Sequence, residues 1–457
     1  MRKTIKIIGT TLLALVLAVT LTGCGPKQAA KPNSLVIWGF VDEDVFKPII
    51  KDFKSSNSAA RSMDIKYVKK DLNSSYENEA LNSILSGQGP DVWAIPNDWV
   101  YRHKEKLSPA PPTVLKNSRI VMRDYFVDPI IKDNVFDSQV YGFSPSVDIL
   151  QAFYNPSLFD NAQTLSRKVN ENNEEQRDRI AKILNNFPVT WNEFNQAVPY
   201  LTVRNGPNIS VAGAAIGTSN NVSHPANILS LLMLQNQTKM LSDDLSQAAF
   251  NLPVKNSANQ DVFAGRNALD FYTGFSDPGK PNYTWNSSMP SDVEAFVQGK
   301  VAIIFGYSSL AGYFRQLYPN FNFEQAKMPQ VGEINTIIDF AHYTTYAVPE
   351  LSPVSQTAWE FIAYLSTDAA STYQSATKEI SSRLSDENAN LKERGSGAAT
   401  TAQTKTAQTW NKGRYPVEID NLFRGAIDRV NNHSQNSQAS LDTAAASTTE
   451  LLRRTTW

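Results

Sequence analysis

Three polar side chains come directly after predicted strands, where they could bind a polar ligand or act on it. Asp42 follows the apolar run SLVIWGF at 34–40, and Asn97 and Asp98 follow DVWAIP at 91–96. In an open α/β sheet, ligands bind beyond the carboxyl ends of the strands. Carboxylates and amides at these ends can bind a ligand by forming hydrogen bonds with its hydroxyl groups. Alternatively, two carboxylates can act as the acid and the base of a catalytic pair. Asp42 is equally suited to cap the next helix, and the alternative for Asp98 is a solvated loop acid.

Familiar catalytic and metal-binding motifs do not occur in the chain. There is no Gly-x-Ser-x-Gly elbow, no phosphate-binding Gly-Lys-Ser/Thr loop and no His-Glu-x-x-His. The Gly-Gln-Gly of SGQGPD precedes a strand, whereas a dinucleotide site needs a helix there. His103, His224, His342 and His433 lack metal-ligand spacing, and we interpret each as a surface or hydrogen-bonded residue. The sequence therefore predicts no cofactor and no metal, although a Ser-His-Asp site with widely separated members stays open.

The first hundred residues predict the sheet that would position these side chains. Strands are expected at 34–40, 64–71 and 91–96, and apolar residues at helical spacing predict a helix in each interval. This β-α-β-α-β order folds with right-handed crossovers into a parallel sheet, so the fold class is α/β. Asp91, at the opposite strand end from the candidate ligands, is expected to be structural. The tryptophans expected in the core are Trp38, Trp93, Trp191 and Trp359.

Later segments continue the mixture of helices and strands. A strand is predicted to end at the Tyr-Asn-Pro turn near Asn155, and residues 292–309 predict a helix, a glycine turn and a strand. Thr190 and Glu193 have the spacing of a capping box at a helix start. Residues 164–186 predict one solvated surface helix. The polar segment 386–408 predicts a loop or insertion, and 441–454 has weak helical character.

The N-terminus predicts a secreted, membrane-anchored protein. A basic head (Arg2, Lys3, Lys6) precedes an apolar run that is shorter than the ~20 residues of a membrane span. The run ends in LTGC, which resembles the lipobox of bacterial lipoproteins. That resemblance implies a signal peptide at 1–23, lipidation of Cys24, the only cysteine, and a tether at 24–33. The alternative is a buried thiol after an uncleaved helix, which the polar residues that follow Cys24 disfavour.

The overall composition describes a globular body with a nearly balanced surface. The chain has 457 residues, with 43 Lys+Arg against 44 Asp+Glu, and 41% of its residues are hydrophobic. This length suggests two lobes. The charge balance argues against binding nucleic acid or a lipid surface through a polybasic face.

A series of landmarks resembles the extracellular solute-binding proteins of bacterial ABC importers, of the maltose and oligosaccharide type. They occur in the family's order over nearly all of residues 34–457. The landmarks are Gly89-Pro90-Asp91, Tyr154-Asn155, Thr190-Trp191-Asn192-Glu193-Phe194 and Phe296-x-x-Gly299-Lys300-x-Ala302.

The resemblance implies a two-lobe α/β fold of the periplasmic-binding-protein type (type II), with a ligand cleft between lobes joined by hinge crossings. We expect lobe 1 at 34–146 with 341–378, and lobe 2 at 149–338 with 385–457. The crossings are expected near 146–149, 339–341 and 376–384.

Site residues follow from the same resemblance. Asp42, Asn97 and Asp98 match positions where the family binds sugar, so two lines of reasoning agree on them. Asp148, in SVDIL, matches a cleft acid, and because a buried carboxylate without a partner is costly we expect a ligand contact or a hinge hydrogen bond. Tyr307 and Ser308 match an aromatic platform and its donors. Further candidates for ligand contact are Trp99, Asn221, Trp285, Tyr343 and Phe423, although core packing is the more common role of a single aromatic residue.

One position departs from the family pattern. Where maltose-type members carry an aromatic residue after the Gly-Lys strand, this chain has Ser309, and the loop at 283–289 is a candidate substitute.

These observations predict a lipid-anchored receptor on the outer face of a bacterial cell membrane. It would be a monomer that captures a sugar or oligosaccharide and passes it to the permease of an ABC importer, without catalysis. The alternatives are a lipoprotein glycoside hydrolase, with a carboxylate pair drawn from Asp42, Asp98 and Asp148, and a surface lectin that serves no transporter. The sequence names neither the solute nor the permease.

Overall fold

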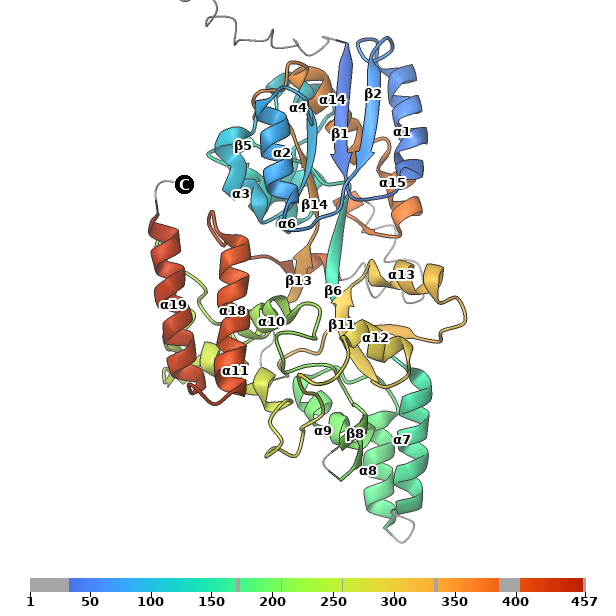
Figure 1. Cartoon of the computed structure of the whole chain (residues 1–457), viewed down its shortest axis with the longest axis vertical. Coiled ribbons are helices and arrows are strands. Elements are labelled where there is room, and N and C mark those ends of the chain that lie inside the picture. The colour runs from blue at the N-terminus through green and yellow to red at the C-terminus, as the bar shows by residue number, and fades with distance from the viewer. Residues whose placement is uncertain are drawn as a thin grey trace, which may run out of the picture.

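Two lobes, each built around its own sheet, lie one above the other along the long axis of the molecule (Figure 1). The computed structural model describes residues 33–169, 173–206, 208–256, 258–332, 336–385 and 403–454. The predicted signal peptide, Cys24 and the tether up to residue 32 lie outside the described residues. Residues 386–402 of the predicted polar loop also lie outside them. The predicted two-lobe α/β fold is confirmed.

The first lobe contains the predicted parallel sheet. Strands β1 (Ser34–Gly39), β2 (Asp64–Lys69) and β3 (Val92–Pro96) are parallel and lie in the order β3-β1-β2. β14 (Thr344–Ala347) returns late in the chain and pairs antiparallel with β3 at the edge. Helices α1 and α2 connect the parallel strands as expected. The helices of this lobe are α1 (Glu43–Ser56), α2 (Tyr76–Leu85), α3 (Trp99–His103), η1 (Lys104–Lys106), α4 (Pro112–Asn117), α5 (Met122–Tyr125), α6 (Asp128–Asn134), α14 (Ser355–Ser366) and α15 (Ala370–Thr377), and a small hairpin joins β4 (Val135–Phe136) to β5 (Gln139–Val140).

The second lobe surrounds a mostly antiparallel sheet in the order β11-β6-β13-β16, to which β12 and β15 add through β6. Its strands are β6 (Ser146–Tyr154), β11 (Ile303–Tyr307), β12 (Glu324–Lys327), β13 (Asp339–His342), β15 (Ile380–Ser381) and β16 (Ala407–Gln408). Its helices are α7 (Pro156–Val169), α8 (Glu174–Leu184), α9 (Trp191–Leu201), α10 (Pro225–Gln235), α11 (Ala264–Gly274), α12 (Asp292–Val297), α13 (Leu310–Leu317), η2 (Gln403–Lys405), α18 (Pro416–Asn431) and α19 (Ser437–Arg453). Short ribbons join β7 (Val203–Asn205) to β8 (Asn208–Val211) and β9 (Val254–Lys255) to β10 (Asp261–Val262).

Strand β6 runs from the upper lobe into the lower one (Figure 1), and four strands in the described part of the chain pair with it. Near its start, Val147 pairs with Ile380 of β15. One step further, Asp148 pairs with His342 of β13, and its last residues pair with β11 and β12. The start of β6 and the strands β13 and β15 lie where the sequence predicts the hinge crossings. The exact lobe boundaries stay predictions.

Most local expectations are confirmed. The four tryptophans expected in the core are all buried, with Trp93 and Trp359 at 0% exposure. Asp91 is structural, because its carboxylate accepts hydrogen bonds from the Val36 amide and from Ser352. The weakly helical tail is the long helix α19. No helix of the described residues is both long and apolar enough to cross a membrane.

Two local expectations are wrong. The described end of the predicted loop at 386–408 contains η2 and β16, and β16 pairs with β13. The predicted single surface helix at 164–186 is two helices, since α7 ends at Val169 and α8 begins at Glu174. The Asn173 side chain caps α8 by accepting a hydrogen bond from the Gln176 amide. Helix α8 is also anchored to the lobe rather than fully solvated, because Ile180 and Leu184, one turn apart, are buried in the core.

Candidate functional site

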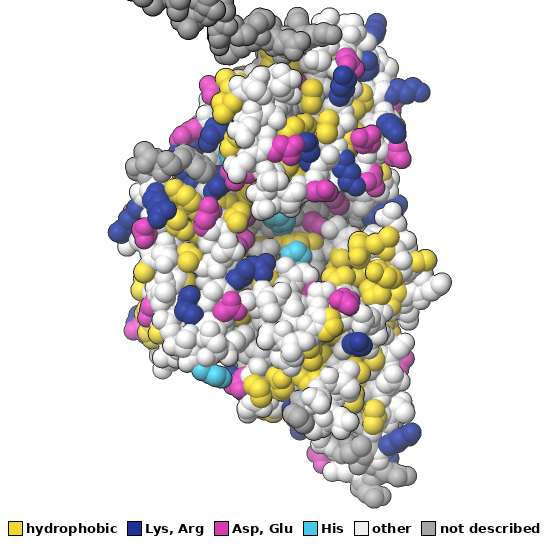
Figure 2. All heavy atoms as spheres, viewed as in Figure 1, with side chains coloured by type: hydrophobic (Ala, Val, Ile, Leu, Met, Phe, Trp, Pro, Cys, Tyr) yellow, Lys and Arg dark blue, Asp and Glu magenta, His cyan; other side chains and the backbone are white. Residues whose placement is uncertain are grey.

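A cavity of about 410 Å³ lies between the two lobes. In Figure 2 it is a hollow that contains histidine and acidic side chains. The first lobe contributes Phe40, Leu72, Pro96, Tyr343 and Thr344. The second lobe contributes Ser223, His224, Val293, Tyr307, Ser309, Leu310 and Tyr313. The segments that cross between the lobes contribute Asp148, His342 and Glu379.

Tyr307, the last residue of β11, is the centre of an aromatic wall. Its hydroxyl accepts a hydrogen bond of 2.6 Å from the Asn227 side chain. Its ring centroid lies 4.8 Å from that of His224 and 5.5 Å from that of His342. Burial lowers the pKa of His224 to about 4, and the positive charges of His342 and Arg424 act in the same direction. His224 is therefore neutral at physiological pH and offers a ring and a hydrogen-bonding nitrogen.

Two carboxylates face the cavity from the crossing segments. The Oδ1 atom of Asp148 accepts hydrogen bonds from the Ser308 hydroxyl and, at 3.1 Å, from the Ser309 amide. Glu379 accepts a hydrogen bond from the Ser146 hydroxyl. Burial raises the pKa of Glu379 to about 7, and the charge of Asp148 adds to this effect. Burial also raises the pKa of Asp148, against the opposing effect of its hydrogen bonds.

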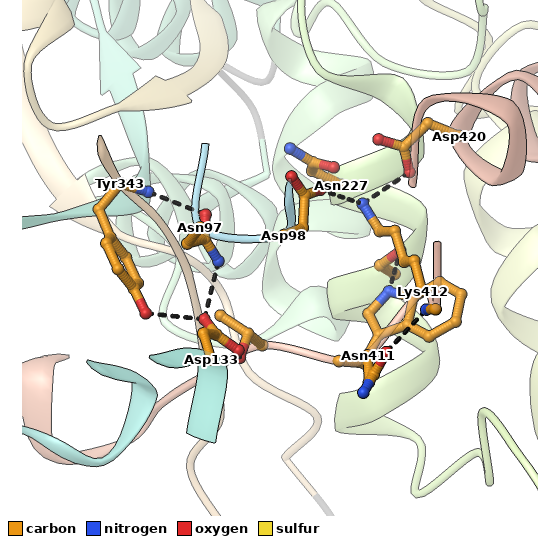
Figure 3. Close-up of polar contacts among 12 residues, drawn as sticks. Asn97, Asp98, Asp133, Asn227, Tyr343, Asn411, Lys412 and Asp420 are labelled. Carbon is orange, nitrogen blue, oxygen red and sulfur yellow. Dashed lines mark hydrogen bonds and ion pairs between the residues drawn. The ribbon is translucent and has the colours of Figure 1, made fainter. Parts of the chain in front are cut away.

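A buried lysine joins the lobes beside the cavity. Lys412 is 5% exposed, and its ammonium group lies 2.8 Å from Asp420 of α18 and 3.3 Å from Asp98 at the start of α3. Figure 3 shows the lysine side chain pointing between the two acids. Burial by itself lowers the pKa of Lys412, but the charges of Asp420 and Asp98 outweigh it and raise the pKa. Lys412 is therefore a permanent cation that holds an acid of each lobe.

A second polar network fixes the strand ends of the first lobe. Asn97 donates a hydrogen bond of 2.8 Å to Asp133, which also accepts one of 2.8 Å from the Tyr343 hydroxyl (Figure 3). The backbone carbonyl of Tyr343 accepts a hydrogen bond of 3.0 Å from the Asn97 amide, and the Tyr343 amide donates one of 3.2 Å to the side-chain oxygen of Asn97. Thr409, next to β16, donates to the other oxygen of Asp133. The network ties the rim of the cavity to a segment of the second sheet.

Some of the residues predicted from sequence meet around this cavity. Asp148, Tyr307 and Tyr343 line it. Ser308 holds Asp148 in place, and Asn97 and Asp98 belong to the two networks beside it.

The structure does not bring the other candidates to the cavity wall. Asp42 is exposed and pairs with Lys69 at 2.5 Å, and although it occupies the N-cap position of α1 its side chain makes no capping hydrogen bond. Trp99 packs in an aromatic cluster of the first lobe. Trp285 is buried, and its indole nitrogen donates a hydrogen bond of 3.0 Å to Asn221. Phe423 is 0% exposed and stacks on Trp410 in the core of the second lobe.

Sequence reasoning missed most residues of the cavity, among them two histidines, an acid and a tyrosine. His224 and His342, expected as surface or hydrogen-bonded residues, line it. Glu379 lies in the crossing segment predicted near 376–384, and an acidic residue in such a segment is the sequence signal that could have identified it. Tyr313 lies one turn after Ser309 on α13 and provides an aromatic ring that the predicted loop at 283–289 does not bring to the cavity. The signal in the sequence is a tyrosine four residues after Ser309, the position that lacks the family's aromatic residue.

The arrangement is suited to reversible binding of a polar solute. Aromatic rings provide flat apolar faces, while carboxylates, histidines and hydroxyls accept and donate hydrogen bonds around them. Within the described residues, no group of three or more histidine, cysteine or acidic side chains is placed to hold a metal ion.

Comparison with known proteins identifies the family. The family model for bacterial extracellular solute-binding proteins matches residues 49–389. No curated protein matches the sequence. Among solved structures, the chain is similar to a solute-binding protein of an ABC transporter from Thermotoga lettingae bound to α-D-tagatose, with a TM-score of 0.70, 18% identity, and coverage of 92% of this chain and 100% of the other.

Two further structures have the same fold. One is the sugar-binding protein MalE from Xanthomonas citri, with a TM-score of 0.69, 18% identity, and coverage of 92% of this chain and 97% of the other. The other is UgpB from Mycobacterium tuberculosis in complex with glycerophosphocholine, with a TM-score of 0.69, 14% identity, and coverage of 92% and 98%. With its two lobes, the cavity between them and a family match over most of its length, this chain belongs to the bacterial extracellular solute-binding proteins.

Proposed function

We propose that the protein captures a sugar or oligosaccharide between its lobes and delivers it to the permease of an ABC importer. The observation that carries this proposal is the cavity itself, in which Tyr307 and Tyr313 offer rings to the C–H faces of a sugar while Asp148 and His342 offer acceptors and donors to its hydroxyls. Structural relatives bound to tagatose and to maltotetraose support the carbohydrate class.

The lobes supply the mechanism of capture. A ligand that contacts both walls binds the closed arrangement more tightly than the open one, and this difference shifts the population toward closure. No bond is made or broken. We further propose that residues 1–23 are removed and that lipid on Cys24 holds the receptor at the outer face of the membrane, close to its permease.

Binding is tested with a panel of mono- to tetrasaccharides in a thermal unfolding experiment. A ligand at about 100 times its Kd stabilises the folded state by about 2.7 kcal/mol, which is a clear shift in Tm. Tyr307→Ala should abolish the shift, whereas Phe423→Ala, which alters only the core, should lower Tm and keep the ligand-induced shift. A clear shift with another solute class and none with any sugar would refute the carbohydrate assignment.

Two further measurements separate the alternatives. Chromatography of the sugar after prolonged incubation should recover it unchanged, and the appearance of cleaved product would establish a glycoside hydrolase. Growth in the presence of a labelled fatty acid should label the protein, and Cys24→Ser should remove the label and release the protein from the membrane. Label that persists in Cys24→Ser would contradict the anchor.

A further inference from the structure

Among the described residues that line the cavity, the titratable side chains other than tyrosines are two acids, Asp148 and Glu379, and two histidines, His224 and His342. Asp148 and Glu379 face the cavity, and the lining contains no lysine or arginine. Asp98 and Asp420, which lie behind the wall, act on Tyr307 by their charge, as Asp148 does from the wall itself. Lys412 is shared by Asp98 and Asp420, so this neighbourhood keeps an excess of negative charge. Acidic side chains around the hollow are visible in Figure 2.

The nearby cations do not neutralise the lining acids. Arg424 acts on His224, but its guanidinium donates a hydrogen bond of 2.7 Å to the Ser219 carbonyl and is not part of the lining. His342 lowers the pKa of Asp148 by its charge, but burial outweighs this contribution.

Both lining carboxylates are suited to accept a donor group of a ligand. The hydrogen bonds that Asp148 accepts from the Ser308 hydroxyl and from the Ser309 and Ile149 amides all go to Oδ1, and the Ser309 side chain also acts on this carboxylate. Glu379 accepts the Ser146 hydroxyl through Oε2, and no described residue donates to Oε1. Because buried carboxylates are costly without a partner, a donor group of the solute would be stabilised beside them.

Aromatic rings enclose the same space. Phe40 of the first lobe and Tyr307 and Tyr313 of the second line the cavity together with the acids. Carboxylates combined with aromatic faces favour a positively charged group, because the ring faces attract cations and the acids neutralise them. A negatively charged solute would meet repulsion from both acids.

We propose that the solute carries a positively charged nitrogen, so that amino sugars and their oligomers are preferred over neutral and anionic sugars. This inference rests on the proposed function, since it assigns a charge to the solute of the same cavity. The ammonium group would lie between Asp148 and Glu379, and the sugar ring would pack against Tyr307 or Tyr313.

The proposal gives a definite pH dependence. Asp148 and Ser146 of β6 act on Glu379, and Glu379 acts by its charge on the buried Tyr346 of β14 and Tyr373 of α15. His224 and His342 line the same cavity. The tyrosines stay neutral because burial raises their pKa values. Glu379, with a pKa near 7, gains a proton as the pH falls from 8 to 6. A cation binds the deprotonated carboxylate, so its Kd should rise by about tenfold per pH unit below 7. A neutral sugar releases no proton on binding and should show no such slope.

The test compares matched ligands by isothermal titration calorimetry at pH 7 and pH 5. Glucosamine and its oligomers are compared with the corresponding glucose and N-acetylglucosamine compounds, with glucuronate and with spermidine. We expect the amino sugars to bind at least about tenfold more tightly than their neutral partners at pH 7, and to lose this preference at pH 5, a range in which their amine stays protonated. Glu379→Gln should remove the preference and the pH slope. Asp64→Asn, which changes an exposed acid paired with Lys66, is the matched control and should keep both.

Each outcome separates the inference from the function on which it rests. Neutral sugars that bind as tightly as amino sugars would overturn the charge assignment and leave the receptor function intact. Binding of spermidine without any sugar would support the charge assignment and refute the carbohydrate function. Binding of none of these compounds would refute both. If Glu379→Gln does not fold, the pH slope of the unaltered protein still decides the question.

Discussion

At the scale of single residues, burial decides which aromatic side chains can touch a ligand. Tyr307 and Phe423 look alike in the sequence as aromatic residues near expected cleft loops. In the structure Tyr307 lines the cavity, whereas Phe423 packs between Trp410 and Phe250 with ring centroids at 5.8 and 5.0 Å. The two residues therefore contribute to different properties, ligand binding for Tyr307 and stability for Phe423.

The Phe423→Ala variant tests this division of roles. Removing a fully buried ring leaves a cavity, so the free energy of unfolding should fall by about 3–5 kcal/mol. Urea denaturation followed by tryptophan fluorescence gives the measurement. Ligand affinity, measured on the folded fraction, should change by less than about threefold. A loss of ligand affinity without a loss of stability would show that Phe423 contributes to ligand binding.

At the scale of secondary-structure elements, local signals in the sequence are strong where a helix begins. Thr190 accepts a hydrogen bond of 3.1 Å from the Glu193 amide, and the Glu193 carboxylate accepts one of 3.2 Å from the Thr190 amide. This is the capping box predicted from the spacing of the two residues. It fixes the first turn of α9, which places Trp191 and Phe194 in the core of the second lobe.

Thr190→Ala should weaken that helix start. The loss of an N-cap side chain costs about 1 kcal/mol in the free energy of unfolding, which chemical denaturation resolves. Asn192→Ala is the control, because Asn192 is exposed in the same turn and alanine favours the helix, so stability should stay equal or rise. Equal losses in the two variants would show that the cap has no special role.

At the scale of the whole molecule, the lobes are held together by contacts between residues far apart in the chain. Lys412 of the second lobe binds Asp98 of the first, and Arg102 of the first lobe donates hydrogen bonds to the Arg414 carbonyl and to Glu418. No sequence pattern pairs residues more than 300 positions apart, so these ties appear only in the folded protein.

Lys412→Met tests the buried ion group. It leaves Asp98 and Asp420 without their cation, and the loss of one partner from a buried pair costs about 3–5 kcal/mol in the free energy of unfolding. Adding Asp98→Asn and Asp420→Asn to the same chain removes the uncompensated charges and should recover most of that loss. A single variant as stable as the unaltered protein would show that the three charges are not coupled.

The sequence by itself determined the class of fold, the order of the first strands and helices, and several landmarks of the family. These features depend on local periodicity, helix capping and strand order, and such signals lie in residues that are close together in the sequence. The resemblance of the sequence to the family also pointed to Asp148 and Tyr307, and Tyr343 followed from its position near an expected cleft loop.

Only the tertiary structure decided which polar residues face the cavity and which face one another. Asn97 and Asp98 follow the predicted strand, yet both are occupied by partners from other segments, Asp133 and Lys412. Glu379 and His342 enter the cavity because separate crossing segments meet along β6. Residue type and local spacing do not reveal this, since the direction and partner of a side chain depend on the packing of segments that are distant in the chain.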